Sequence, residues 1–144
     1  MDLCSRKIVG WAMDERMTTD LVARALHMAL CRRQPVPGLL PHADRGAQYA
    51  SHEYQRMLAV YGMVVSMSRR GNCYDNAPIE SFWRTRKTAA PDANQRWATR
   101  QQAKTAIFAY LEAFYHDRRR GCPLGATLGY KSPDEFERLF ALGA

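Results

Sequence analysis

Two short polar stretches contain the residues best suited to chemistry: HADRGAQY at 42–49 and SMSRRGNCYDNAPIES at 66–81. In the first, Asp44 ends a short apolar run and is soon followed by a glycine. An acid in that position lies at the rim of a sheet, where a ligand can reach its carboxylate. In the second, the Asp-Asn-Ala-Pro sequence is typical of a helix start, and Glu80 falls in the first turn.

Asp44 and Glu80 are together a possible ligand pair for a divalent metal. One carboxylate ends a strand and the other opens a helix, and carboxylate oxygens are ligands of this kind of ion. Both acids also have an ordinary structural interpretation. Asp44 would then begin a turn, and Glu80 would complement the helix dipole. The residues alone leave both interpretations open.

The composition favours one folded domain with a polyanionic partner. The 144 residues are enough for one domain, and 47% hydrophobic with 24% charged residues allow a packed core. Lys and Arg number 21 against 14 acids, which gives a net charge of +7 and a pI near 9.5. Such a balance indicates nucleic acid as the partner. A basic protein without such a partner is the alternative, because charge counts do not locate charges.

Several other classes of protein are not indicated. The 4 cysteines are widely spaced and the 4 histidines are scattered, so no zinc motif is present. The cysteines are typical of reduced thiols in a cytosolic protein. The sequence contains no apolar run of membrane-spanning length, no signal-peptide pattern and no internal repeat. We therefore expect a cytoplasmic protein without a membrane partner.

Apolar patterns predict strands that alternate with helices, the order typical of an α/β arrangement. A strand at 5–13 would need a neighbour for its backbone. Thr18 or Thr19 would cap the first helix, and Gly62 would stop the second. The expected strands cover 5–13, 39–43 and 63–67, and the expected helices 18–33 and 51–61, the latter with Tyr54, Met57, Leu58 and Tyr61 at core spacing.

A loop at 68–76 precedes a helix predicted over 77–89. Its buried side would carry Ile79, Phe82 and Trp83, and its other face Glu80, Arg84 and Lys87. In one interpretation Glu80 pairs with Arg84 on an ordinary exposed face. In the other, Glu80 is a carboxylate of the reaction site, and Arg84 and Lys87 extend along the helix to bind phosphates.

The C-terminal part is predicted to be helical. After a linker at 91–97, Thr99 and Gln102 form a capping box for a helix that runs to about His116, with an apolar stripe that is typical of a core. A basic cluster at 118–120 and a Gly- and Pro-containing loop follow. Ser132 then caps a last helix with Pro at its first position.

Three separated motifs, HADRGAQYASHEY, SMSRRGNCYDNAPIESFWRTRKT and the tail from WATRQQAK to GYKSPDEF, occur in an order that is similar to a known family. They resemble the catalytic core of bacterial insertion-sequence transposases with a retroviral-integrase-like domain. SRKIVGWAM and the helix after it match too, so the resemblance covers essentially the whole chain. It implies an α/β, ribonuclease H-like integrase core with C-terminal helices. It also implies strand cleavage and transfer at the ends of a mobile DNA element.

The resemblance assigns roles to individual residues. Thirty-five residues lie between Asp44 and Glu80, the interval typical of the last two acids of the family's Asp-Asp-Glu triad. Both acids would be catalytic and would bind metal, and the complete family site holds two Mg²⁺ (or Mn²⁺) ions. The other expected site residues bind DNA (Arg69, Arg70, Arg84 and Lys87) or shape the site (His42 and Asn76).

The family's first catalytic aspartate has no counterpart here. In the family it lies on the first strand, upstream of the segment that resembles MDLCSRKIVGWAM, and Asp2 matches a different position. We therefore expect a core that lacks its first strand and most of its second, with exposed strand edges and apolar faces. Residues 1–90 would form this partial core, and 91–144 a helical extension of the same domain. RRRGCPLGATLGYKSP is longer than the family's loop, which leaves that loop without a transferred role.

The sequence thus predicts a fragment of a transposase core whose partners are the DNA of element ends and targets. With an incomplete triad it is expected to be inactive alone. The full-length protein is expected to be a homo-oligomer in the bacterial cytoplasm, associated with the nucleoid. Two alternatives stay open: a non-catalytic DNA-binding or transposition-modulating remnant, and a product that does not fold stably.

Overall fold

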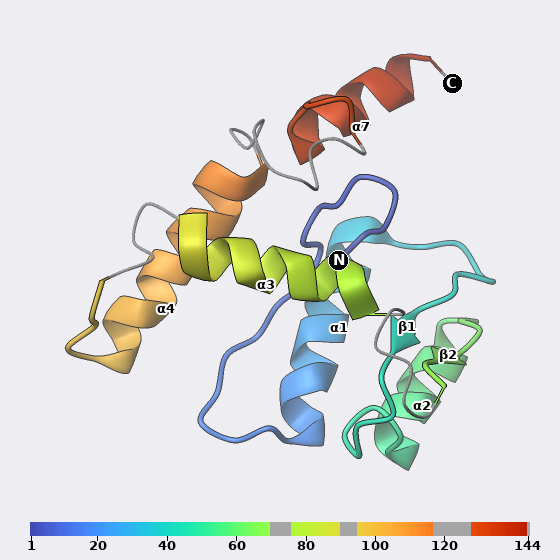
Figure 1. The fold of residues 1–144 in the computed structure, drawn as a ribbon. Helices are drawn as coiled ribbons and strands as arrows, with labels where there is room; N and C mark the ends of the chain where they lie inside the picture. The colour runs from blue at the N-terminus through green and yellow to red at the C-terminus, as the bar shows by residue number, and fades with distance from the viewer. Residues whose placement is uncertain (70–75, 90–94, 117–127, 144) are drawn as a thin grey trace. The chain divides into compact units, whose positions relative to one another are not determined.

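The computed structural model describes residues 1–69, 76–89, 95–116 and 128–143. It forms two compact units, one of Val9–Ala77 and one of Met1–Ile8 with Pro78–Ala144. Within the described ranges, no helix is long and apolar enough to cross a membrane. The elements, coloured along the chain in Figure 1, are α1 (Thr19–Arg33), β1 (His42–Ala43), α2 (His52–Val60), β2 (Ser66–Met67), α3 (Ala77–Ala89), α4 (Arg100–Ala109), the π-helix η2 (Tyr110–Tyr115) and α7 (Pro133–Leu142).

The sheet of the unit Val9–Ala77 consists of β1 and β2, which pair in parallel with His42 opposite Ser66. Main-chain hydrogen bonds extend the pairing beyond the regular strands. The amide of Val64, for example, donates to the carbonyl oxygen of Leu39 over 2.9 Å. The two apolar runs predicted as strands therefore do pair, and they do so in parallel.

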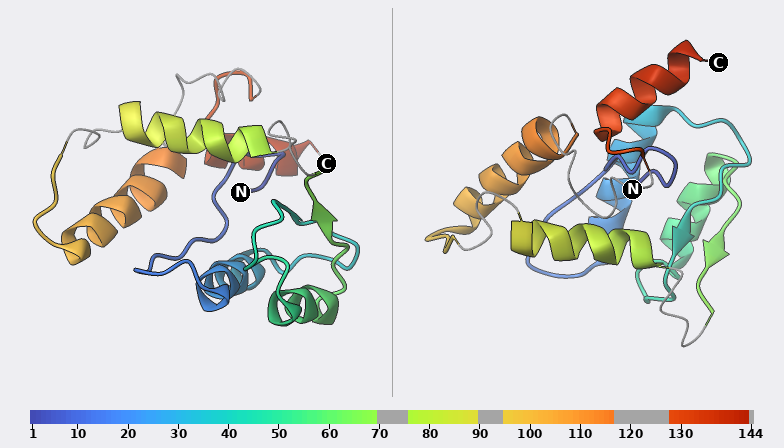
Figure 2. Two further views of the ribbon diagram at one scale, coloured as in Figure 1. Left: turned by 60° about the horizontal axis from the view of Figure 1, so that its bottom comes forward. Right: turned by 45° about the horizontal axis from the view of Figure 1, so that its top comes forward.

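Two helices of this unit, α1 and α2, lie side by side in both views of Figure 2. Thr18 caps α1, as predicted, and its hydroxyl accepts a hydrogen bond from the amide of Leu21 over 3.3 Å. Gly62, with a φ of +64°, follows α2 and turns the chain toward β2. Tyr61 was expected in the core but is exposed, because it lies after the last turn of α2. The core comprises Leu30, Tyr54, Leu58 and Met63.

The strand predicted at 5–13 does not form, although all of these residues are described. Arg6 has a φ of +61°, in the left-handed region that strands do not use. The amide of Ile8 donates to Nε2 of His116 over 3.2 Å. The carbonyl oxygen of Arg6 accepts from the hydroxyl of Tyr115 over 2.8 Å. Side chains from the helical part thus bind the backbone groups that a neighbouring strand would need.

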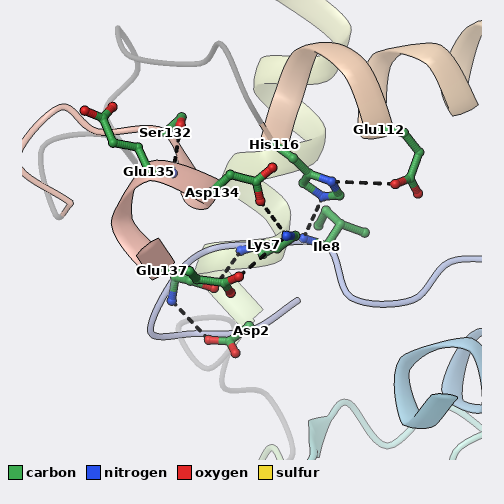
Figure 3. Close-up of polar contacts among 10 residues, drawn as sticks. Asp2, Lys7, Ile8, Glu112, His116, Ser132, Asp134, Glu135 and Glu137 are labelled. Carbon is green, nitrogen blue, oxygen red and sulfur yellow. Dashed lines mark hydrogen bonds and ion pairs between the residues drawn. The ribbon is translucent and has the colours of Figure 1, made fainter. Parts of the chain in front are cut away.

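The N-terminal residues are held to this helical part by further polar contacts (Figure 3). The ammonium group of Lys7 pairs with Asp134 and lies 3.5 Å from Oε2 of Glu137. Because Nε2 of the buried His116 accepts a hydrogen bond, its ring proton is on Nδ1, which lies 3.9 Å from Oε2 of Glu112. Two consecutive residues of the N-terminal segment are therefore held to the helical part, Lys7 through its ammonium group by acids of α7 and Ile8 through its amide by His116.

Helix α3 has the bounds that the sequence predicts, but its buried face is narrower than expected. Phe82 is 2% exposed and its ring centroid lies 4.9 Å from that of Tyr115. Trp83, predicted to be buried, is 47% exposed. Consecutive residues of an α-helix point about 100° apart, so these two aromatic rings cannot both face the same partner.

Two further predicted helix caps form. The hydroxyl of Thr99 accepts a hydrogen bond from the amide of Gln102 at the start of α4. The hydroxyl of Ser132 accepts one from the amide of Glu135 at the start of α7. Each cap satisfies an amide that has no partner inside its own helix, which is why local sequence predicts these starts well.

The helix predicted to run to His116 is α-helical only to Ala109 and continues as the π-helix η2. The wider π turn shifts the side chains that follow it relative to an α-helical register. None of the α4 residues is fully buried, whereas Tyr110, Leu111 and Tyr115 of η2 are. The predicted apolar stripe is confirmed in its periodicity, because Ala103, Ala106 and Ile107 are the half-buried residues of α4 and the stripe continues into the buried Tyr110 and Leu111.

Replacement of Leu58 by Ala tests the core between α1 and α2. Leu58 is 2% exposed, so its truncation should leave a cavity and lower the free energy of unfolding by about 2–5 kcal/mol. Urea denaturation of the 144-residue chain measures the change. Val60→Ala, on the same helix but 76% exposed, should change it by less than about 0.5 kcal/mol. Equal effects of the two substitutions would contradict this packing.

Candidate active site

Asp44 follows directly after β1, and its side chain is exposed. Its Oδ1 atom accepts a hydrogen bond from the amide of Gly46 over 2.9 Å. This is the turn expected in the structural interpretation of the sequence. Within the part of the chain that the structure describes, no donor contacts the second oxygen, Oδ2. The turn therefore orients the carboxylate and leaves one oxygen available for a ligand.

His42, two residues before Asp44, links the ends of β1 and β2 through its side chain. Its Nδ1 atom lies 2.8 Å from Oγ of Ser66, and its Nε2 atom lies 3.0 Å from Oγ of Ser68. A hydroxyl can donate or accept, so both contacts can persist whether the ring is neutral or protonated. The amide of the buried Ser68 also donates to the carbonyl oxygen of Ala43 over 3.0 Å. The backbone that leads into Asp44 is thus fixed from the side of β2.

The sequence did not point to three of the residues around Asp44, namely Ser66, Ser68 and Arg45. Nε of Arg45 donates to the carbonyl oxygen of Ser68 over 2.9 Å. A signal was available: in the Ser-Met-Ser sequence the two serines share one face of the strand. Pairing the two predicted strands in parallel would have placed that face beside the histidine.

Tyr49 and Tyr54 both have raised pKa values, and Asp44 contributes to the shift of Tyr49. Burial raises the pKa of Tyr49, and the negative charge of Asp44 raises it further. Burial likewise raises the pKa of Tyr54 to about 12, with a smaller contribution from Tyr49. The two rings meet edge to face, with centroids 5.5 Å apart. The Asp44 carboxylate is therefore close enough to the phenol of Tyr49 to oppose its ionisation.

Glu80 belongs to the other compact unit, in the first turn of α3. Its side chain is exposed, as are those of Arg84 and Lys87 on the same helix face. Among the described residues, no ion pair links Glu80 with Arg84. The interpretation in which these two residues pair on an ordinary exposed face is therefore not supported. Arg86 differs, because it is buried with its guanidinium carbon 4.7 Å from the ring centroid of Tyr110.

The remaining predicted site residues are only partly described. Arg69 is exposed just beyond β2, and the half-buried Asn76 precedes α3. Arg70 lies outside the described residues. Carboxylate oxygens are of the type that Mg²⁺ prefers, yet the described residues contain no group of three His, Cys, Asp or Glu side chains placed to hold a metal ion. They provide suitable single donors and not a complete metal site.

Comparisons with known proteins give a consistent result. The integrase core domain family matches residues 1–73, a range that includes Asp44. The chain is 45% identical to the "insertion element IS600 uncharacterized 31 kDa protein" of Shigella sonnei over 124 residues, which are 86% of this chain and 45% of that protein. It is 43% identical over 138 residues to the "transposase for insertion sequence element IS904" of Lactococcus lactis, covering 96% of this chain and 53% of that protein.

A third relative is the "transposase InsF for insertion sequence IS3A" of Escherichia coli, 39% identical over 137 residues, or 95% of this chain and 46% of that protein. The chain thus spans about half the length of the curated relatives it matches. No solved structure matches it.

The raised pKa of Tyr54 predicts a loss of stability at high pH. The unfolded chain releases this proton near the ordinary pKa of 10.0, whereas the folded chain keeps it to about 12. Above pH 10 the unfolded state therefore binds fewer protons, so the stability present below pH 10 falls as the pH rises toward 12. Urea midpoints from pH 9 to 12 should fall less steeply for Tyr54→Phe than for the wild type.

The exposed Tyr61 provides the matched control for this measurement. Tyr61→Phe should follow the wild-type curve. If Tyr54→Phe also followed it, the buried phenol would not be a source of the alkaline loss.

Proposed function

Because the chain belongs to the integrase core domain family, we propose that it acts as the catalytic core of an insertion-sequence transposase, which cuts and joins DNA strands at the ends of a mobile element. The observation that carries the proposal is the exposure of the Asp44 carboxylate at the end of a strand. This carboxylate directly follows a parallel strand and has one oxygen free of hydrogen bonds among the described residues. Ligands of open α/β sheets bind beyond the carboxyl ends of the strands.

In this proposal Asp44 and Glu80 supply two carboxylates of a site for Mg²⁺ or Mn²⁺, with two ions when the site is complete. Bound ions would polarise the phosphoryl oxygens and activate a water or a 3′-hydroxyl. His42 holds the strand end that presents Asp44, and Asn76 lies just before the helix that presents Glu80. The four basic residues that the sequence assigns to DNA phosphates in this proposal are Arg69, Arg70, Arg84 and Lys87.

Electrostatics supports DNA as the partner. The chain has a net charge of +7, and the structure records no acidic partner for Arg69, Arg84 or Lys87 among the residues that it describes. Free surface cations that replace the counterions of DNA provide most sequence-independent affinity. The DNA would comprise element ends and targets, and we expect the full-length protein to act as a homo-oligomer.

A second candidate function is DNA binding without catalysis, as a remnant that modulates transposition. The resemblance gives this chain two acids where the family uses three, and a basic surface binds DNA without any triad. We accordingly expect the 144 residues alone to bind DNA without strand transfer.

A chimera tests the two candidates. This chain replaces the matching 138-residue half of the IS904 transposase, and excision of a marked IS904 element from a donor plasmid is counted. Asp44→Asn and Glu80→Gln should each lower excision more than about 100-fold, because residues that merely support a metal ligand already contribute 10- to 100-fold. Glu53→Gln, an exposed acid on α2, should leave excision unchanged.

Excision by an active chimera that is indifferent to both substitutions would remove Asp44 and Glu80 from the site. A chimera that binds element ends but never excises, although the IS904 transposase itself does, would favour the non-catalytic candidate. Binding of the ends is measured in parallel on the purified proteins.

Gly46→Ala tests whether the orientation of Asp44 matters. A methyl group at Gly46 would lie 2.9 Å from Oδ1 of Asp44 and 3.0 Å from Nε2 of Gln48. Both atoms are at the ends of flexible side chains, so the carboxylate would move while the fold persists. We expect excision by the chimera to fall by about 10- to 100-fold at an unchanged melting temperature. Full excision at an unchanged melting temperature would show that this turn does not position the acid.

A further inference from the structure

Arg45 is anchored at one end of its guanidinium group. Its Nε atom donates to the carbonyl oxygen of Ser68 over 2.9 Å. Ser68 is itself fixed, because it is 5% exposed, its amide donates to Ala43 and its hydroxyl contacts His42. The Arg45 side chain therefore spans from the residue after Asp44 to the end of β2, at the edge where both parallel strands finish.

The terminal nitrogens at the other end of the Arg45 guanidinium group are accessible to a ligand. Arg45 is exposed, and in residues 1–69 and the other described ranges no acid pairs with it. Arg24 of the same unit differs, because it pairs with Asp14 and lies 2.9 Å from Asp20. An anchored guanidinium loses little side-chain entropy on binding, and its planar fork matches the oxygens of a phosphodiester.

We propose that Arg45 is a DNA-binding residue of the site, held by the Ser68 carbonyl so that its terminal nitrogens bind a backbone phosphate beside Asp44. The inference rests on the proposed function and extends it to a residue outside the four cations already assigned to DNA. Asp44 alone repels a phosphate, and a cation on the adjacent residue offsets this repulsion. The hydrogen bond from Nε leaves the remaining N–H donors of Arg45 free to bind both oxygens of one phosphodiester.

A purely structural role is the competing explanation. Arg45 could simply satisfy the carbonyl of Ser68, a buried residue at the end of β2. Loss of the side chain would then lower the stability of the fold and leave the salt dependence of DNA binding unchanged. The two roles therefore predict different measurements.

The test uses the full 144-residue chain and a fluorescent duplex DNA, with binding measured over a series of NaCl concentrations in the presence of EDTA. Arg45→Gln should lower the slope of log affinity against log salt by about one, which corresponds to one lost phosphate contact. Its melting temperature is measured alongside, because loss of the hydrogen bond to the Ser68 carbonyl lowers stability in either role, and the salt slope alone separates the two roles. Arg56→Gln, which removes an exposed arginine from α2 of the same unit, should keep the wild-type slope.

Arg45→Lys tests the anchor separately from the charge. The ammonium group should restore the wild-type salt slope, but its affinity should stay below the wild-type value because one group cannot hold both the Ser68 carbonyl and a phosphate. Full wild-type affinity for this variant would overturn the anchored geometry.

The outcomes separate this inference from the function on which it rests. If the wild-type chain showed no salt-dependent DNA binding, the proposed function would fail and the role of Arg45 with it. If the wild type bound with a steep salt dependence and Arg45→Gln kept the same slope, only the role of Arg45 would be refuted. A lower melting temperature at an unchanged slope would assign Arg45 to the fold.

Discussion

The parallel register of β1 and β2 is the constraint on which the surroundings of Asp44 depend. It places His42 opposite Ser66 and lets the ring reach Ser68 on the same strand face. Side chains alternate between the faces of a strand, so a slip by one residue would turn both serines away from the histidine. It would also displace the carbonyl that binds Arg45. One register thus fixes the strand end, the position of the acid and the adjacent cation together.

Features set by neighbouring residues could be predicted from the sequence. The starts of α1, α4 and α7 follow from Thr18, Thr99 and Ser132, whose hydroxyls accept hydrogen bonds from amides three residues later. For these caps the deciding contact lies within one turn of the chain. Local patterns also predicted Glu80 in the first turn of a helix and Asp44 after a strand, although that strand forms only by pairing with the distant β2.

Features set by distant residues could not be predicted. The apolar pattern at 5–13 is compatible with a strand, but the partner of the Ile8 amide is His116, 108 residues away. The hydroxyl of Tyr115 is 109 residues from the Arg6 carbonyl that it binds. The π turn that presents these two side chains has no clear sequence pattern either. Hydrogen bonding to a helix replaced pairing to a strand, and nothing local distinguishes the two.

Contacts in the structure show which of the positively charged side chains have partners within the protein. Some cations are used internally: Lys7 and Arg24 pair with acids, and Arg86 lies over an aromatic ring. Others have no acidic partner among the described residues. Arg45 directly follows Asp44, and Arg84 and Lys87 share a helix face with Glu80 in the other unit, whereas Arg16, Arg56 and Lys104 are exposed elsewhere.

Each unit thus presents one carboxylate with uncompensated cations beside it. An acid alone would repel a phosphate, whereas an acid flanked by cations can face a polyanion at short range. The cations next to the candidate acids therefore support the proposal that DNA binds there, and the exposed cations elsewhere add a sequence-independent attraction to a polyanion.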